Sequence, residues 1–244
     1  MNRTLSAIGL VALISGGVAT PAFAQVADMP DGSCQVTSWS AQWGVKESFR
    51  SYLSGAIAQG EWTAEGGVSY DTPTFSFQGE SGWLSPDGHT GELIADGSIR
   101  FYGHGGLLDQ TLSSPTLVIG DEIHLVFDVV GDTREGVSVN QVSVPFVEVT
   151  KAPVIDASSS TWSLVEAPTV LTEAGADAFG NYPAGTDFDP ITVTADVEPG
   201  CVRNSSGPLA WVVSLSVVAT ALGAAVTVWV RRRRGPERPT PQAS

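Results

Sequence analysis

Residues 92–130 have the sequence ELIADGSIRFYGHGGLLDQTLSSPTLVIGDEIHLVFDVV, in which short alternating runs are separated by turns. Alternation of apolar and polar residues is the period of a β-strand with one buried face. It places Ile99 and Phe101 on one face of a strand and, on the opposite face, Arg100, Tyr102 and His104. The glycines on either side of His104 then bend or break that strand. This stretch therefore predicts several short strands in succession.

Runs of the same kind continue beyond it. They cover residues 137–150, 161–171 and 191–197, with turn signals between them such as Pro183-Ala184-Gly185. Many short strands at this spacing are typical of a sandwich or barrel. The sequence predicts an all-β, sandwich-like domain.

One helical pattern precedes the strands, over residues 45–59. Val45, Phe49, Leu53 and Ile57 recur at i+4 spacing, and Tyr52 lies on the adjoining strip of the same face. A helix of this length depends on packing more than on intrinsic propensity. We expect one or two short helices in the fold, the first ending near residue 60.

Both ends of the chain predict export and membrane anchoring. Residues 1–24 combine Arg3, an apolar stretch and the pattern Ala22-Phe23-Ala24, as in a cleaved signal peptide. Residues 209–230 carry no charge and are long enough to cross a hydrocarbon core of about 30 Å as a helix. Four arginines follow, which favours a cytoplasmic position for the tail at 231–244. We therefore expect a single-pass cell-membrane protein with an extracellular domain over residues 25–208.

The predicted extracellular domain is strongly acidic. It contains 25 of the 26 acidic residues of the chain but only six of its 12 basic residues, so its net charge is about −19. Such a surface repels nucleic acid and anionic lipid. An anionic ligand therefore needs a local exception to the overall field.

The two cysteines lie near the two ends of the domain. Cys34 and Cys201 are an even pair in a chain predicted to enter an oxidising compartment, which favours a disulfide over two free thiols. In the chain-entropy model a bond across so long a loop stabilises the fold by roughly 5 kcal/mol. We expect it to join the beginning and the end of the domain.

Patterns of catalytic residues are weak. A set such as Ser54, His104 and Asp109 can be assembled, but the nucleophile-elbow pattern G-x-S-x-G is absent from the sequence. The histidines at 89, 104 and 124 are scattered and do not form the paired spacing of a zinc site. A glycosidase could use two of the many carboxylates, but the sequence does not single out a pair. We predict that the protein is not an enzyme.

Two segments carry a family resemblance. Residues 43–55 have the sequence WGVKESFRSYLSG, and residues 100–109 have the sequence RFYGHGGLLD. In order and distance they resemble the HtaA-type haem-binding domain of actinobacterial surface haem-uptake proteins, over roughly residues 38–197. The first segment is the more specific of the two. A single domain between a signal peptide and a C-terminal anchor is similar to the membrane-tethered members of that family, whereas larger members carry two such domains.

The resemblance implies a haem site with named residues. It implies that Tyr52 is the axial ligand of haem iron, that His104 hydrogen-bonds the tyrosine oxygen, and that Ser54 takes part in the site. The haem would be ferric, b-type and non-covalently bound. Tyrosine is a known haem ligand; its pKa near 10 means that ferric iron and a hydrogen-bond donor must favour the phenolate.

Other site residues follow from position. Phe49, Leu53, Phe101 and Leu107 form an apolar bed for the porphyrin or, equally, part of an ordinary core. Arg100 is a candidate partner for a haem propionate because it shares the predicted strand face of His104. Tyr102 lies on the same face and is the alternative oxygen ligand.

Two functions remain open from the sequence. The first is a cell-surface protein that captures ferric haem and relays it, with other surface haem-binding proteins, towards an ABC-type haem importer. The alternative is a cofactor-free β-sandwich module for surface contact or adhesion, which would show the same signal, disulfide, acidic surface and anchor. Neither function involves nucleic acid.

Overall fold

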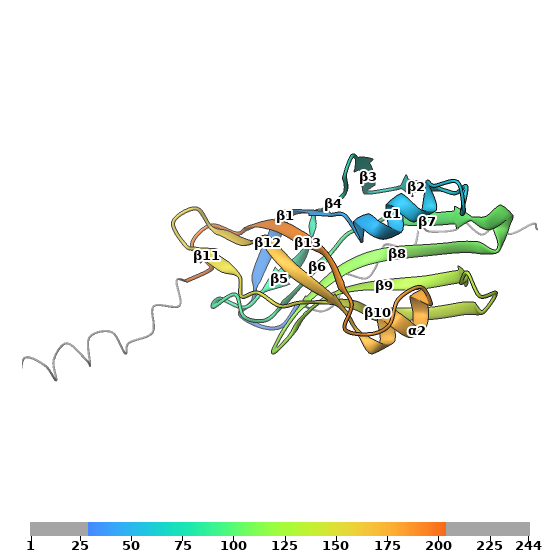
Figure 1. The fold of residues 1–244 in the computed structure, drawn as a ribbon. Helices are drawn as coiled ribbons and strands as arrows, with labels where there is room; N and C mark the ends of the chain where they lie inside the picture. The colour runs from blue at the N-terminus through green and yellow to red at the C-terminus, as the bar shows by residue number, and fades with distance from the viewer. Residues whose placement is uncertain (1–28, 204–244) are drawn as a thin grey trace, which may run out of the picture.

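The computed structural model describes residues 29–203 as a β-rich fold with two short α-helices (Figure 1). The predicted signal peptide at 1–24, the predicted membrane span at 209–230 and the tail at 231–244 lie outside these residues. Within the described part, no helix is long and apolar enough to cross a membrane.

The elements follow one another in a strand-rich order. The first half consists of β1 (Cys34–Trp43), α1 (Glu47–Leu53), β2 (Glu61–Glu65), β3 (Val68–Asp71), β4 (Thr74–Gly79), β5 (Ser81–Leu84), β6 (Gly91–Ile94), β7 (Ser98–Gly103) and the 3₁₀ turn η1 (His104–Gly106). The second half consists of β8 (Leu108–Ile119), β9 (Ile123–Asp132), β10 (Ser138–Val149), β11 (Val154–Asp156), β12 (Thr161–Leu171), α2 (Glu173–Phe179) and β13 (Asp187–Val197).

All the described strands belong to one hydrogen-bonded antiparallel sheet. Its main path runs β11-β12-β10-β9-β8-β6-β5-β1-β4-β3, and β13 pairs with both β1 and β12. The pairing therefore closes on itself through β13, whereas a sandwich has two separate sheets. Register shifts in β8, β10 and β12 explain the curvature, because a bulge bends its strand and increases the local twist. The predicted all-β class with two short helices is confirmed, and the sandwich is replaced by one curved sheet.

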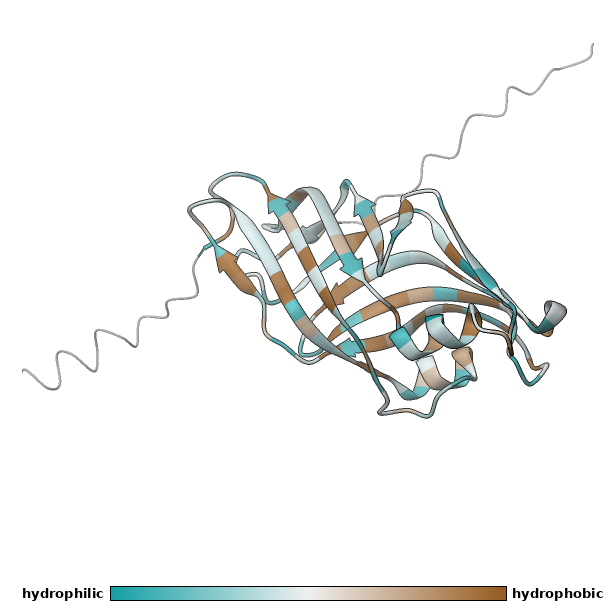
Figure 2. Ribbon diagram, turned by 45° about the horizontal axis from the view of Figure 1, so that its top comes forward, coloured by the Kyte–Doolittle hydropathy of each residue, from teal (hydrophilic) through white to brown (hydrophobic). Residues whose placement is uncertain are grey.

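The core lies between the sheet and the two helices. Figure 2 shows apolar residues alternating with polar ones along the long strands, so that each strand presents an apolar face to the interior. Phe49 of α1 and Phe179 of α2 are in edge-on contact, with ring centroids 4.9 Å apart, and Phe101 of β7 packs against Phe49 at 5.1 Å. Edge-on aromatic pairs contribute about 0.5–1.5 kcal/mol beyond the area they bury. The cluster of these three rings packs both helices against the same half of the sheet (Figure 1).

The predicted disulfide between Cys34 and Cys201 is present. The bond lies at the start of β1, whereas α1 begins just beyond the other end of β1, which is nine residues after Cys34. At about 3.3 Å per residue, the strand separates the two by roughly 30 Å. The closed sheet, its core and this bond are all contained in residues 29–203, as expected of a part of the chain that can fold by itself.

The first helix is shorter than predicted. It begins at Glu47 and ends at Leu53, because Val45 adopts a left-handed φ of 63° and the chain turns after Ser54. The turn is closed by hydrogen bonds from the N–H of Gly60 to the carbonyl of Leu53 and from the N–H of Gln59 to that of Gly55. Ile57 therefore leaves the apolar face that the i+4 pattern assigned to it and is 78% exposed.

Candidate functional site

Helix α1 presents Tyr52 beside its buried face. Phe49 and Leu53 point into the core, and Tyr52, on the adjoining strip, is half-buried. The apolar spacing thus decides which side of α1 is covered. Tyr52 is held by that packing while its oxygen stays within reach of a neighbouring segment.

His104 reaches the site from the end of β7. It has a left-handed φ of 53°, and Gly105 and Gly106 continue with φ of 63° and 100°. Such a succession of positive φ angles favours glycine and tolerates histidine better than bulky side chains. The N–H of His104 donates to the carbonyl of Ala58 at 2.7 Å, which joins the β7 end to the turn after α1.

The structure brings Tyr52 and His104 together. The Tyr52 hydroxyl is hydrogen-bonded to Nε2 of His104, and the two rings have centroids 5.6 Å apart and planes inclined by 44°. The two residues are 52 positions apart in the chain. A phenol oxygen next to an imidazole nitrogen is a site in which one proton can be shared or exchanged between them.

The two turns that carry this pair also contain two exposed apolar side chains. Ile57 lies in the turn after α1 and is 78% exposed, and Leu107 directly follows η1 and is 62% exposed. A Cβ built on Gly105 would meet nothing within 4 Å, so the space over the turn is open. We call Ile57 and Leu107 the apolar fringe of the site, because exposed apolar side chains near a polar pair suit a ligand with an apolar face.

The other predicted site residues divide into two groups. Phe49 and Phe101 are fully buried in the aromatic cluster, so they support the site from beneath and present no surface to a ligand. Their apolar spacing indicated burial correctly, but it could not distinguish a ligand bed from the core. Ser54 is exposed at the C-terminus of α1, where its hydroxyl donates to the carbonyl of Arg50 at 3.0 Å. Its oxygen remains able to accept a hydrogen bond.

Arg100 is engaged with a carboxylate. Its Nε and Nη2 each donate to Asp109 at 2.6 Å in a two-pronged pair, and its guanidinium lies 5.6 Å from the ring centre of Tyr102. The hydrogen bond from Arg100 holds the pKa of Asp109 below its ordinary value. The charge of Arg100 is thus matched within the protein. Arg100 and Tyr102, with Glu61 and Thr63, line a hollow of about 170 Å³ on the outside of β2 and β7.

The remaining histidines lie elsewhere. His124 on β9 is half-buried with Nε2 3.6 Å from the carboxylate of Glu122, and His89 belongs to the turn between β5 and β6. Neither is among the residues gathered around Tyr52.

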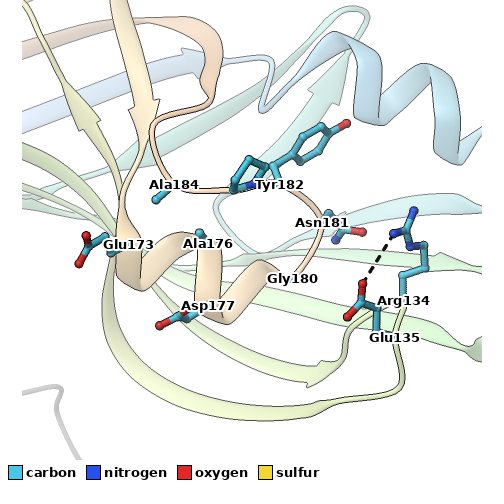
Figure 3. Close-up of a pocket in the computed structure, with 10 residues that line it drawn as sticks. Arg134, Glu135, Glu173, Ala176, Asp177, Gly180, Asn181, Tyr182 and Ala184 are labelled. Atoms are coloured by element: carbon cyan, nitrogen blue, oxygen red, sulfur yellow. Dashed lines mark ion pairs between the residues drawn. The ribbon is translucent and has the colours of Figure 1, made fainter.

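A separate hollow of about 550 Å³ lies over α2 and the loop that follows it (Figure 3). Its lining includes the carboxylates of Glu135, Glu173 and Asp177 against the single cation Arg134. Tyr182 separates it from α1, with its hydroxyl 3.3 Å from that of Ser48. The acidic lining disfavours an anionic ligand such as haem, so this hollow does not compete with Tyr52 and His104.

Two contributors to the site are not predicted from the sequence. The helical spacing of Ile57 predicts that it is buried, whereas the structure exposes it. Asp189, far along the chain, contacts α1 through Arg50 and Glu47. The sequence signal for the Asp189 contacts is the WGVKESFR segment, in which Gly44 leaves room for Asp189 and Arg50 pairs with it.

Comparison with known proteins identifies related folds. The family model described as Htaa matches residues 38–194. The crystal structure of the C-terminal domain of HtaA from Corynebacterium glutamicum is 35% identical, with a TM-score of 0.60, over 68% of this chain and 100% of that one. The N-terminal domain of the same protein is 28% identical, with a TM-score of 0.59, over 67% of this chain and 98% of that one. The haem-binding protein HtaB of that organism shares the fold at 24% identity and a TM-score of 0.52, over 68% of this chain and 97% of that one. No curated protein matches the chain significantly.

Proposed function

The chain belongs to the HtaA family, and we propose on that premise that it is a haem-binding protein in which Tyr52 is the axial ligand of ferric haem iron. The observation that carries the proposal is the hydrogen-bonded pair of Tyr52, on α1, and His104, at the end of β7. The proposal is one of binding and transfer, not of catalysis.

The residues present fit a haem group. The Tyr52 side chain is half-buried, His104 is in place to hydrogen-bond its oxygen, and Ile57 and Leu107 in the two neighbouring turns offer exposed apolar surface. Ferric iron, when bound, supplies the positive charge that stabilises a phenolate. The Tyr52 hydroxyl and Nε2 of His104 are hydrogen-bonded, with the donor set by the tautomer of the histidine. A phenolate oxygen can only accept, so next to a phenolate His104 would have to present Nε2–H as the donor. His104 thus tunes the basicity of the ligand atom.

Anionic propionates are accommodated without a free cation. Arg100 is paired with Asp109, and the described domain carries few other basic residues. We propose that the propionates point to solvent or accept hydrogen bonds from Ser54 and backbone N–H groups. Weak retention of the propionates suits a protein that must release its ligand.

The rest of the proposal concerns place and partners. We propose that residues 1–24 direct export, that the domain is extracellular, and that residues 209–230 anchor it in the cell membrane with the tail at 231–244 in the cytoplasm. The protein would accept ferric, b-type haem from other surface haem-binding proteins and relay it towards an ABC-type importer. Graded affinities along the route are sufficient for net transfer.

A haemin titration of residues 25–208, followed by absorbance, tests the proposal. We expect a saturable spectrum of high-spin ferric phenolate type that is lost in Tyr52→Ala and altered in His104→Ala. Tyr102→Phe is the matched control, because Tyr102 is the alternative oxygen ligand, and it should bind as the wild type does. Equal binding by Tyr52→Ala would contradict the assignment, and no saturable change in the wild type would favour the cofactor-free contact module.

A further inference from the structure

The junction between β1 and α1 is strained and lacks a local cap. Val45 is fully buried with a left-handed φ of 63°, which is rare for a β-branched residue. Lys46 occupies the N-cap position, but its side chain makes no capping hydrogen bond. A seven-residue helix with such a start is not stable alone. The direction of α1 must therefore be imposed by another part of the fold.

Asp189 of β13 supplies the missing contacts. Its Oδ1 accepts the N–H of Glu47 at 2.9 Å, as a cap residue would. Its own N–H donates to the carbonyl of Val45 at 2.9 Å, and its carbonyl accepts Nε1 of Trp43 at 2.9 Å. One residue of a distant strand thus holds three successive parts of the junction.

Arg50 completes the arrangement from within α1. Its side chain is only 9% exposed, and Nη1 donates both to Oδ2 of Asp189, at 2.7 Å, and to the carbonyl of Gly44. A Cβ at position 44 would lie 2.2 Å from Oδ2 of Asp189 and 2.7 Å from Nη1 of Arg50. Position 44 therefore requires glycine, because the side chains of Arg50 and Asp189 occupy the space that a Cβ would fill.

Arg50 is two residues from Tyr52, so the two side chains leave α1 in different directions. The ion pair of Arg50 and Asp189 contacts one side of α1, whereas Tyr52 contacts His104 from a different side of the same helix. This ion pair is largely withdrawn from solvent, so its net contribution to stability is small, but its hydrogen bonds require a defined geometry. We infer that Arg50 and Asp189 are positioning residues that set the orientation of α1 and so hold the Tyr52 oxygen against His104. Their role in haem binding rests on the proposed function.

The first variant is Asp189→Asn in residues 25–208. The amide oxygen can still accept the N–H of Glu47, but Arg50 is left without its counter-charge. We expect the ring ¹⁵N resonances of His104 to shift in haem-free protein, and the amides of α1 to exchange faster with solvent. Haemin affinity should fall about 10- to 100-fold, as for loss of other outer-shell partners of a metal ligand.

The second variant, Arg50→Met with Asp189→Asn, separates positioning from a general loss of stability. Removing both charges relieves the unpaired guanidinium and should restore much of the lost urea stability. The His104 resonances and the haemin affinity should nevertheless stay altered. Trp162→Phe is the stability control, because it removes one buried hydrogen bond, to Gly88, near the disulfide end of the sheet. It should lower stability and leave both site measurements unchanged.

The outcomes distinguish this inference from the proposed function. Shifted His104 resonances in a protein whose wild type binds no haemin would support the positioning pair and remove the haem role. Wild-type resonances and affinity in both Asp189 variants would overturn the positioning pair while haem binding stands. Recovery of resonances and affinity together with stability in the double variant would also overturn it.

Discussion

The exposed apolar fringe of the site predicts a loss of haem affinity without a loss of stability. Ile57 and Leu107 are 78% and 62% exposed in the free protein. Complete burial of such a side chain is worth about 1.5–3 kcal/mol. A flat macrocycle covers about half of what is exposed, so each contact should contribute roughly 0.5–1 kcal/mol. Replacing either residue with serine should weaken haemin binding about two- to fivefold, and replacing both should weaken it about tenfold.

The assay is a haemin titration of residues 25–208 beside urea unfolding of the haem-free protein. Exposed side chains outside special features change stability by no more than about 0.5 kcal/mol, so the unfolding midpoints should stay close to the wild type. Val142→Ser is the matched control, because Val142 is 75% exposed on β10 and belongs to neither site segment. Wild-type affinity in the double variant would refute the reasoning, as would an equal loss in Val142→Ser.

Two further predictions concern the frame of the domain. Replacing Cys34 and Cys201 by serine should lower the free energy of unfolding by about 5 kcal/mol in the chain-entropy model, because the bond closes a loop with a sequence separation of 167; an unchanged urea midpoint under non-reducing conditions would contradict this. The hydrogen bond from Arg100 lowers the pKa of Asp109 in the folded protein, so its stabilising effect is present above the ordinary carboxyl pKa and is lost as pH falls through the lowered value. The melting temperature of Asp109→Asn should therefore lie below that of the wild type at neutral pH and converge with it below about pH 4, and a gap that widens in acid would show the sign to be wrong.

Much of the fold was accessible from local patterns. The alternation around Ile99 and Phe101 predicted their burial, and the spacing of Phe49 and Leu53 predicted the buried face of α1. The positions of Cys34 and Cys201, in a chain whose sequence predicts export, predicted their bond. The two segments that contain Tyr52 and His104 were recognisable because their residues are close together in the chain.

What escaped prediction depends on residues far apart in the chain. The i+4 pattern continued through Ile57, but the left-handed backbone at Val45 and the hydrogen bond between Gly60 and Leu53 confine α1 to seven residues. The closure of the sheet through β13 likewise depends on two partner strands, and periodicity within a strand does not name its neighbours.

The site shows the same division. The family resemblance of two local segments singled out Tyr52 and His104 as candidates, and folding set their rings 5.6 Å apart. Arg50 and Asp189 are 139 residues apart, and nothing in the spacing around either residue indicates the other. Periodicity records which side of an element is buried, because burial repeats along the chain. The partner of a buried charge leaves no such repeat, so it emerges only when the strands have paired.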